Sequence, residues 1–417
     1  MKFNSPKGTR DLLPDEAIKY QIVTGILRRV YKKYGFGPLD TPAFESFGLF
    51  AAKGGVGEAV KDEIYYFKDK AKRELALRFE FTASLARVIS NNINLPKPFK
   101  RYQIGKVWRY DNPQALRWRE FWQSDADIIG SSSELADVEC LAVAVDCLRE
   151  LGFKRFTIRM NDRRLTEEIF NSYGIPKGKM KEAFRIVDKL DKIGLEGVKK
   201  ELTEKKIDPK KIQQMLSING TNTQILKKLS KFENTMPLKW ILKYAKELGI
   251  DNHLKIDLSL VRGLEYYTGP VFEIALGAKV SCGGGGRYDN LIKTMGGPDL
   301  PATGISFGLD RVISVMTEKR MFDDINEPGI FLIAVNDKTR NDVLNICKTL
   351  REKGVIAEFD LMNRPLSKQL QYANSIGIRY VGILGEKELR KKSIKLKNMK
   401  SGKEKLVKIK DLFKNIR

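Results

Sequence analysis

The sequence predicts an α+β protein in which strand-rich segments are interrupted by a helical insertion and followed by a separate α/β domain. Residues 166 to about 248 are rich in lysine and have a helical pattern without strong strand signals. From residue 328 onward, short apolar segments alternate with helical stretches, which is typical of a small, mostly parallel α/β domain. Strand-like patterns mark the rest of the chain: 63–69, 73–79, 100–110, 121–129, 153–160, 254–260 and 271–282. We therefore expect a core in two parts, at 1–165 and 251–322, with an insertion at 166–250 and a C-terminal domain at 328–417.

The predicted elements have local signals. Apolar side chains recur at helical spacing from Ile18 to Tyr34, with Asp15 and Glu16 in the first turn and Gly35 just beyond the end. The segments 63–69 and 73–79 alternate partially, as the strands of a hairpin do. Further helices are predicted at 133–151, 337–353 and 366–376.

Composition limits the kind of protein. The chain has 417 residues, of which 42% are hydrophobic, and no apolar run is long enough to span a bilayer. The N-terminal sequence MKFNSPKGTRDLLPDEA has charges and prolines where a signal peptide requires an apolar stretch. We therefore expect a cytoplasmic protein with no membrane partner.

Cysteine and histidine are scarce. The four cysteines form no CxxC pair and His253 is the one histidine, which argues against a zinc site and against a histidine general base. We expect His253 to be an ordinary surface or packing residue and expect no metal site. The chemistry should then rest on Arg, Glu, Asp, Gln and Tyr.

The net charge of +24, from 76 basic and 52 acidic residues, favours a polyanionic partner. A lysine-rich surface common to the proteins of the organism would explain the charge equally well. Phosphate contacts supply affinity and little sequence information, so charge alone does not identify the partner.

Four consecutive glycines, Gly283 to Gly286, do not match a phosphate-binding loop. They lack the GxxxxGK[ST] pattern, because Arg287-Tyr288-Asp289 follow them, and they also lack the spacing of a dinucleotide fingerprint. The run predicts either close approach of the backbone to something flat or buried, or a tight turn between strands.

Three further segments combine arginine with aromatic residues or glycine. Residues 107–127 (VWRYDNPQALRWREFWQSDAD) suit phosphate binding slightly better than a cation–π surface. Residues 259–273 (SLVRGLEYYTGPVFE) place two tyrosines beside glycines, a pattern more often found in a core than at a ligand. Residues 304–311 (GISFGLDR) predict a strand turning into a helix, with either nucleotide binding or packing at the turn.

In their order and combination these segments resemble the histidyl-tRNA synthetases, from Pro6-Lys-Gly-Thr-Arg-Asp11 to the C-terminus, with a loose match in the insertion. TPAFES, with Pro42 and Glu45, is similar to class II motif 1, WRYDNPQALRWREFWQ to motif 2 and GISFGLDR to motif 3. LVRGLEYYTGPVFE and GGRYDNLI resemble the two histidine-specific signatures. The resemblance implies a class II synthetase catalytic core on an antiparallel sheet, a C-terminal α/β anticodon-binding domain and a homodimer.

The resemblance also implies an activity: a histidine–tRNA ligase that activates L-histidine with ATP and transfers it to the 3′ end of tRNA(His). Magnesium would accompany ATP. The histidine carboxylate that attacks the α-phosphorus is already ionised, so no general base is required. Arginines would neutralise two anions that approach each other.

The implied histidine-binding residues surround the two ends of the substrate. Glu80 and Thr82 match the pair that binds the α-ammonium group, with Gln123 near the same group. Asp127 and Tyr267 match the residues at the two imidazole nitrogens, and Tyr288 lies nearby in the second signature. Because neutral imidazole has one donor and one acceptor nitrogen, a carboxylate and a hydroxyl can select it.

The implied ATP-binding and catalytic residues are mostly arginines. Arg109 and Arg262 would hold the α-phosphate and the attacking carboxylate, and Arg311 would clamp the nucleotide. Asp111 stands where class II enzymes often have Glu for the adenine amino group. A second departure is at Phe79 and Phe81, which flank Glu80 where Pro and Gly are usual.

Two other classes of protein remain as alternatives. The synthetase-like regulatory subunit of ATP phosphoribosyltransferase is non-catalytic, typically lacks the anticodon domain and erodes the signatures, whereas Arg109, Arg262 and Arg311 are all present here. A plain nucleic-acid-binding module would not need the two histidine signatures.

Overall fold

A computed structural model describes residues 3–51, 63–114, 116–261, 266–277, 281–323 and 329–416 of the chain. The chain divides into two compact units, Met1–Met321 and Phe322–Arg417. Each unit has a sheet and a hydrophobic core of its own.

The first unit is built on an eight-stranded sheet with the order β1-β5-β6-β11-β10-β9-β7-β8. Its strands are β1 (Gly37–Pro38), β5 (Phe99–Trp108), β6 (Glu120–Ile129), β7 (Thr157–Asp162), β8 (Leu254–Ile256), β9 (Pro270–Ala275), β10 (Gly283–Arg287) and β11 (Ala302–Gly308). The inner pairings from β5 to β7 are antiparallel, while the outer pairs β1–β5 and β7–β8 are parallel. The antiparallel core implied by the sequence is therefore confirmed.

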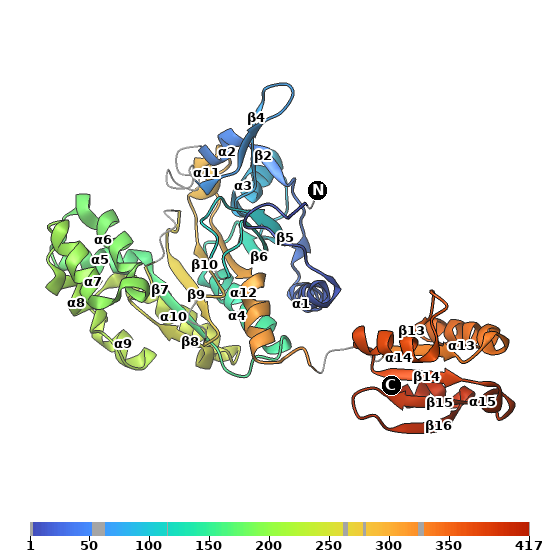
Figure 1. The fold of residues 1–417 in the computed structure, drawn as a ribbon. Helices are drawn as coiled ribbons and strands as arrows, with labels where there is room; N and C mark the ends of the chain where they lie inside the picture. The colour runs from blue at the N-terminus through green and yellow to red at the C-terminus, as the bar shows by residue number, and fades with distance from the viewer. Residues whose placement is uncertain are drawn as a thin grey trace. The chain divides into compact units, whose positions relative to one another are not determined.

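Three helices pack against this sheet and against one another: α1 (Pro14–Lys33), α4 (Glu134–Glu150) and α12 (Leu309–Glu318) (Figure 1). α1 begins with Pro14, carries acidic residues in its first turn and is followed by Gly35, whose φ of 73° favours glycine. α4 begins after Ser133, whose hydroxyl accepts a hydrogen bond from the Leu135 amide. The helices predicted at 15–34 and 133–151 are confirmed to within one residue at each end.

A smaller antiparallel sheet lies in the same unit. Its strands are β2 (Phe44–Ser46), β3 (Tyr66–Lys68) and β4 (Glu74–Leu77), so the predicted hairpin is confirmed as the β3–β4 pair. Three short helices accompany it: α2 (Phe47–Ala51), α3 (Thr82–Asn91) and α11 (Leu291–Thr294). Leu85 and Ile89 of α3 and Leu291 of α11 pack in one cluster with Ile129 of the large sheet.

Between β7 and β8 the chain is helical. The helices are α5 (Arg163–Ser172), η2 (Lys177–Lys179), α6 (Met180–Val187), α7 (Leu190–Glu204), α8 (Pro209–Leu216), α9 (Asn222–Lys228), η3 (Glu233–Thr235), α10 (Met236–Glu247) and η4 (Asp251–His253). Residues 163–253, all of which the structure describes, contain no strand. Figure 1 shows α5 to α9 gathered at the β7–β8 end of the sheet, whereas α10 packs against α4.

The second unit has a five-stranded sheet with the order β13-β12-β14-β15-β16. Its strands are β12 (Gly329–Ala334), β13 (Ile356–Phe359), β14 (Tyr380–Leu384), β15 (Ser393–Asn398) and β16 (Glu404–Lys408). Its helices are η5 (Asp337–Thr339), α13 (Arg340–Glu352), α14 (Leu366–Ser375), α15 (Glu386–Arg390), η6 (Ile409–Asp411) and α16 (Leu412–Ile416).

This second sheet is mixed, so the prediction of a mostly parallel domain is wrong. β12 pairs in parallel with β13 and β14, but β14–β15 and β15–β16 are antiparallel. Parallel neighbours need a long crossover, which α13 and α14 supply, whereas the short connections after β14 allow antiparallel pairing only. The signal was visible in SIKLKN, where buried Ile394 and Leu396 alternate with lysines.

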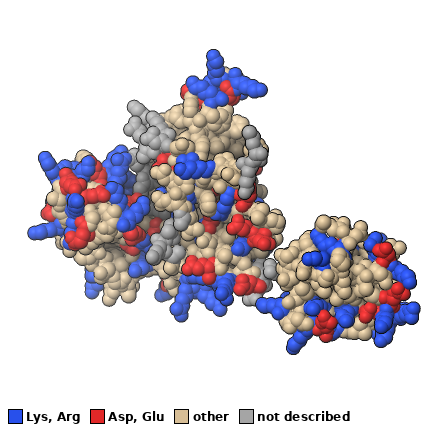
Figure 2. Space-filling view, viewed as in Figure 1, with Lys and Arg blue, Asp and Glu red and all other residues tan. Residues whose placement is uncertain are grey.

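Charged side chains cover much of the face in Figure 2, where lysine and arginine are interspersed with acidic residues on both units. Within the described part of the chain, no helix has both the length and the apolar character needed to cross a membrane.

Candidate active site

A cavity of about 380 Å³ opens on the large sheet. Most of its lining residues come from β6, β10 and β11, from the segment between β5 and β6 and from residues 79–82, and others come from residues 266–267 and from the start of α12. These stretches are far apart in the sequence, so the sheet order brings them together.

Strand register determines which side chains reach the cavity floor. Gln123, Asp125 and Asp127 alternate along β6, and directly opposite them on β11 lie Gly308, Ser306 and Gly304. Residues opposite one another in an antiparallel pair point to the same face. The floor therefore carries three polar side chains beside two glycines and a serine.

The glycine run is strand β10 in the interior of the sheet, and not a turn. A side chain at Gly286 would meet the Pro270 carbonyl and the Tyr267 ring, and one at Gly304 would overlap the carboxylate of Asp127. Of the two interpretations of the run, close approach of backbone and neighbouring groups is the one that the structure supports.

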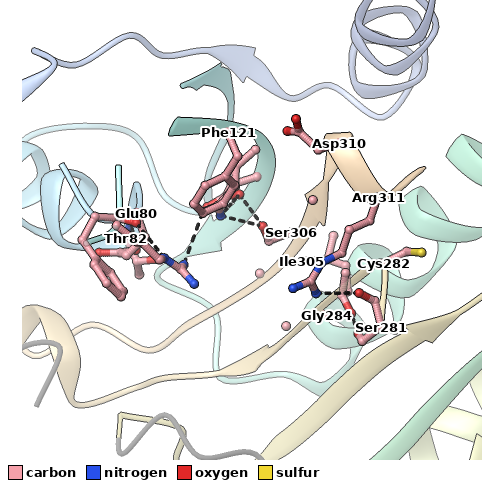
Figure 3. A pocket seen from close by; sticks show the side chains of 18 of the residues that line it. Glu80, Thr82, Phe121, Ser281, Cys282, Gly284, Ile305, Ser306, Asp310 and Arg311 are labelled. Carbon is pink, nitrogen blue, oxygen red and sulfur yellow. Dashed lines mark hydrogen bonds between the residues drawn. The ribbon is translucent and has the colours of Figure 1, made fainter. Parts of the chain in front are cut away.

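Glu80 and Thr82 lie at one side of the cavity (Figure 3). The Glu80 carboxylate accepts hydrogen bonds from the backbone amides of Thr82 and Ala83, the latter at 2.7 Å, at the start of α3. Burial raises the pKa of Glu80, and these hydrogen bonds oppose the rise. Its flanking Phe79 lies under the Arg109 guanidinium, 4.2 Å from the ring centre, which gives this departure from the family pattern a packing role.

Polar groups on the floor form a hydrogen-bonded triangle. Gln123 Nε2 donates to Ser306 Oγ at 3.1 Å and to Asp125 Oδ1 at 3.3 Å, and Ser306 Oγ donates to the same Asp125 oxygen at 2.6 Å. Burial raises the pKa of Asp125 to about 7, with Arg101 opposing the rise and Asp127 adding to it.

Asp127 and three tyrosines form the deep end of the cavity. The Tyr288 hydroxyl donates to Asp127 Oδ1. The Tyr266 ring lies 4.8 Å from that of Tyr267 and 5.9 Å from that of Tyr288. A carboxylate, phenol hydroxyls and aromatic faces are groups that can hold a flat ring with polar nitrogens.

Arginines occupy the rest of the lining. Arg109 reaches Gln123 Oε1 at 3.5 Å, and burial lowers the pKa of its guanidinium. At the opposite side from Glu80 in Figure 3, Arg311 donates to the Ser281 carbonyl at 2.8 Å. Asp111 also lines the cavity. Both cations line the same cavity, Arg109 on the Glu80 side and Arg311 on the other, and each can attract an anionic group into it.

Asp310, at the start of α12, joins the site to the N-terminal segment. Its carboxylate accepts hydrogen bonds from the Trp122 amide at 2.7 Å, from Tyr20 at 2.7 Å and from Arg10 at 2.8 Å. The Arg10 guanidinium also lies 4.4 Å from the centre of the Trp118 ring, which lines the cavity. The N-terminal segment thereby supports the motif 2 loop.

Nine of the ten site residues predicted from the sequence line this one cavity: Glu80, Thr82, Arg109, Asp111, Gln123, Asp127, Tyr267, Tyr288 and Arg311. Arg262 lies outside the described residues. Sequence reasoning missed Asp125, Ser306 and Asp310. The alternation of polar residues at 123, 125 and 127 in a strand was a signal for the first of them.

The fold and the site together define a class II aminoacyl-tRNA synthetase. A family model described as histidyl-tRNA synthetase matches residues 8–312, and one described as an anticodon binding domain matches residues 329–417. The chain belongs to the histidyl-tRNA synthetase family.

Individual relatives are similar to this protein over nearly the whole chain. A histidine–tRNA ligase of Methanococcus maripaludis is 38% identical over 422 residues, which cover 99% of each chain. The crystal structure of histidyl-tRNA synthetase from Nostoc sp. PCC 7120 superposes with a TM-score of 0.87 at 31% identity, covering 100% of this chain and 99% of that one. A structure described as an ATP phosphoribosyltransferase regulatory subunit/histidyl-tRNA synthetase from Bacillus halodurans is similar in fold, with a TM-score of 0.75 at 20% identity, covering 89% of this chain and 96% of that one.

Proposed function

We propose that this protein activates L-histidine with ATP to histidyl-adenylate and transfers the histidyl group to the 3′ end of tRNA(His). The observation that carries the proposal is one cavity whose lining combines Asp127 and three tyrosines with the two cations Arg109 and Arg311. Such a cavity suits one substrate with a polar ring and another with phosphates.

Histidine binding uses the acidic end. Glu80, Thr82 and Gln123 receive the α-ammonium group. Asp127 accepts the imidazole N–H, and Tyr267 serves the other ring nitrogen. Tyr288 donates to Asp127 and so orients its carboxylate. An amino acid without this donor–acceptor pair leaves buried polar groups unmatched, which discriminates strongly.

The first chemical step joins two anions. A carboxylate oxygen of histidine attacks the α-phosphorus of ATP, the bond to the bridging oxygen breaks, and pyrophosphate leaves. Arg109 and Arg262 neutralise the carboxylate and the α-phosphate, while Arg311 holds the nucleotide and Asp111 its adenine amino group. Because both substrates are bound in one cavity, their translational and rotational entropy is lost on binding and not in the chemical step.

Magnesium enters with the phosphates of ATP. Among the described residues, no group of three His, Cys, Asp or Glu side chains is arranged to hold a metal ion. A magnesium ion that arrives bound to the phosphates of the nucleotide does not require such a group.

The second unit binds the tRNA. Its match to the anticodon-binding family supports this role. Lys395 and Lys397 of β15 share one acidic partner, Glu404, so the three side chains together keep a positive charge, and phosphate contacts of such groups weaken as salt is raised. We also propose that the protein is located in the cytoplasm, which cell fractionation would test.

The protein works as a homodimer. On the small sheet, Phe44 of β2 is 50% exposed and Phe67 of β3 is 38% exposed, and their rings lie 6.2 Å apart. Both lie on the β2–β4–β3 face that also carries Leu75 and Leu77, and Phe44 belongs to the segment that resembles motif 1. Light scattering should give twice the mass of the chain, and Phe44→Asp should shift the protein toward monomer.

The test of the activity is histidine-dependent exchange of pyrophosphate into ATP, compared with the other amino acids. We expect exchange with histidine alone, followed by charging of tRNA(His). A regulatory subunit shares the fold but would not catalyse exchange. The absence of histidine-dependent exchange would therefore overturn the proposal.

A further inference from the structure

A buried arginine lies behind the acidic end of the cavity. Arg101 of β5 stands directly opposite Asp127 of β6, and its side chain is 1% exposed. Its Nη2 atom is 2.7 Å from Asp127 Oδ2. Arg101 is not among the residues that line the cavity, so it acts on a substrate only through residues that do, and Asp127 is the one with which it forms an ion pair.

The guanidinium has few other partners. Among the described residues, its three nitrogens make no well-aligned hydrogen bond, and the contact with Asp127 is an ion pair. Burying a guanidinium with so little compensation is costly. Replacing such a pair by apolar residues often stabilises a fold, so stability alone does not account for Arg101.

Asp127 is held from two sides. Oδ2 meets Arg101 and Oδ1 accepts the Tyr288 hydroxyl, while Asp127 itself lines the cavity. A carboxylate oxygen has a second lone pair, so Oδ1 can still accept from a ligand. The side chain is thereby fixed in one orientation before a substrate arrives.

We propose that Arg101 is a positioning residue for histidine recognition, which keeps the Asp127 carboxylate charged and aimed at the imidazole N–H. This inference rests on the proposed function, because it assigns Arg101 to the same histidine pocket. Glu80, Asp125 and Asp127 all line one cavity, and Arg101 forms an ion pair with Asp127.

The electrostatics agree with this role. Burial raises the pKa of Asp127, whereas Arg101 and the Tyr288 hydrogen bond lower it. The titratable groups near Asp127 are Arg101 from β5, Asp125 from β6 and Tyr288 from the segment after β10, with Tyr31 from α1 and Cys140 from α4 close enough to interact with its charge. Without Arg101, none of these neighbours carries a positive charge, so the pKa of Asp127 would rise and its protonation would extend to higher pH.

The experiment is pyrophosphate exchange with Arg101→Met, Arg101→Lys and the control Lys100→Met. Lys100 is the next residue on β5, points to the other face and pairs with Glu139 instead. At pH 7 we expect Arg101→Met to raise the KM for histidine about 10-fold or more, the factor for losing a charge-assisted hydrogen bond, and to leave the KM for ATP within 2-fold. Arg101→Lys should recover part of the loss, and Lys100→Met should match the wild type.

The pH profile separates positioning from a structural role. For Arg101→Met the histidine KM should approach that of the wild type as pH rises from 7 to 9, because Asp127 ionises again. The proposal would be overturned if the histidine KM of Arg101→Met were raised by the same factor at every pH. It would also be overturned if the KM values for histidine and ATP rose equally.

A double variant keeps the test valid if Arg101→Met folds poorly. Arg101→Met in an Asp127→Asn background leaves no unpaired buried charge, and it should have the same histidine KM as Asp127→Asn alone. A further increase would contradict action through Asp127. Wild-type exchange with histidine is the reference, and its absence would refute the proposed function and not this inference.

Discussion

Replacing Gly304 by alanine should damage histidine recognition without removing any functional group. Gly304 lies opposite Asp127 in the β6–β11 pair, and a Cβ at this position would overlap an Asp127 carboxylate oxygen and lie 3.0 Å from the Ala126 carbonyl. The backbone cannot yield easily because β11 is paired on both sides. The Asp127 side chain must therefore rotate away from Tyr288 and Arg101.

The size of the effect follows from these contacts. Overpacking a well-packed interior costs about 1–3 kcal/mol. A carboxylate moved out of place also loses a charge-assisted hydrogen bond to its ligand, worth about 1.5–3 kcal/mol. We therefore expect the KM for histidine to rise by roughly 10-fold to 100-fold and the melting temperature to fall by a few degrees. The KM for ATP should change by less than about 2-fold, since Arg109 and Arg311 lie elsewhere in the cavity.

The assay is histidine-dependent pyrophosphate exchange, with both KM values and the melting temperature measured for each variant. Gly25→Ala is the matched control, because Gly25 lies in α1 with nothing within 4 Å of a Cβ. Alanine there should leave exchange unchanged and stabilise the helix by about 0.5–1 kcal/mol. An unchanged histidine KM for Gly304→Ala would refute the placement of Asp127 in the histidine pocket.

Three further predictions concern other parts of the chain. Arg311→Ala should raise the KM for ATP about 10-fold in the exchange assay and leave that for histidine within about 2-fold; an unaltered ATP value would exclude Arg311 from the nucleotide site. Burial raises the pKa of Asp125 to about 7, so the stability that its proton contributes is present below about pH 4 and is lost as pH rises to 7. Urea unfolding of Asp125→Asn should show a smaller fall in stability between pH 5 and 7.5 than the wild type, and an identical fall would show that Asp125 is ionised throughout. A chain ending at Met321 should retain exchange, since all cavity-lining residues precede this point, and should charge tRNA poorly; full charging would contradict a tRNA-binding role for the second unit.

Local sequence signals were sufficient for much of the architecture. Helices α1 and α4 were placed by apolar spacing and by residues at their ends, which act within one or two turns. The resemblance to the family supplied the antiparallel core and nine cavity residues, because its motifs carry information that periodicity does not. β15 and β16 were not predicted, although β15 carries the local signal of a half-buried strand in Ile394 and Leu396, which alternate with lysines.

By itself, the sequence determined many of the helical and extended segments, the positive charge, and the polar residues available for chemistry. Tertiary structure alone decided that Gly283–Gly286 form an interior strand, that Gly304 must lack a side chain beside Asp127, and that Arg101 is buried behind that carboxylate. The physical reason is that helix ends and side-chain periodicity are set by near neighbours in the chain. Strand order, register and buried ion pairs instead depend on segments up to about 200 residues apart meeting in one core, as β6 and β11 do.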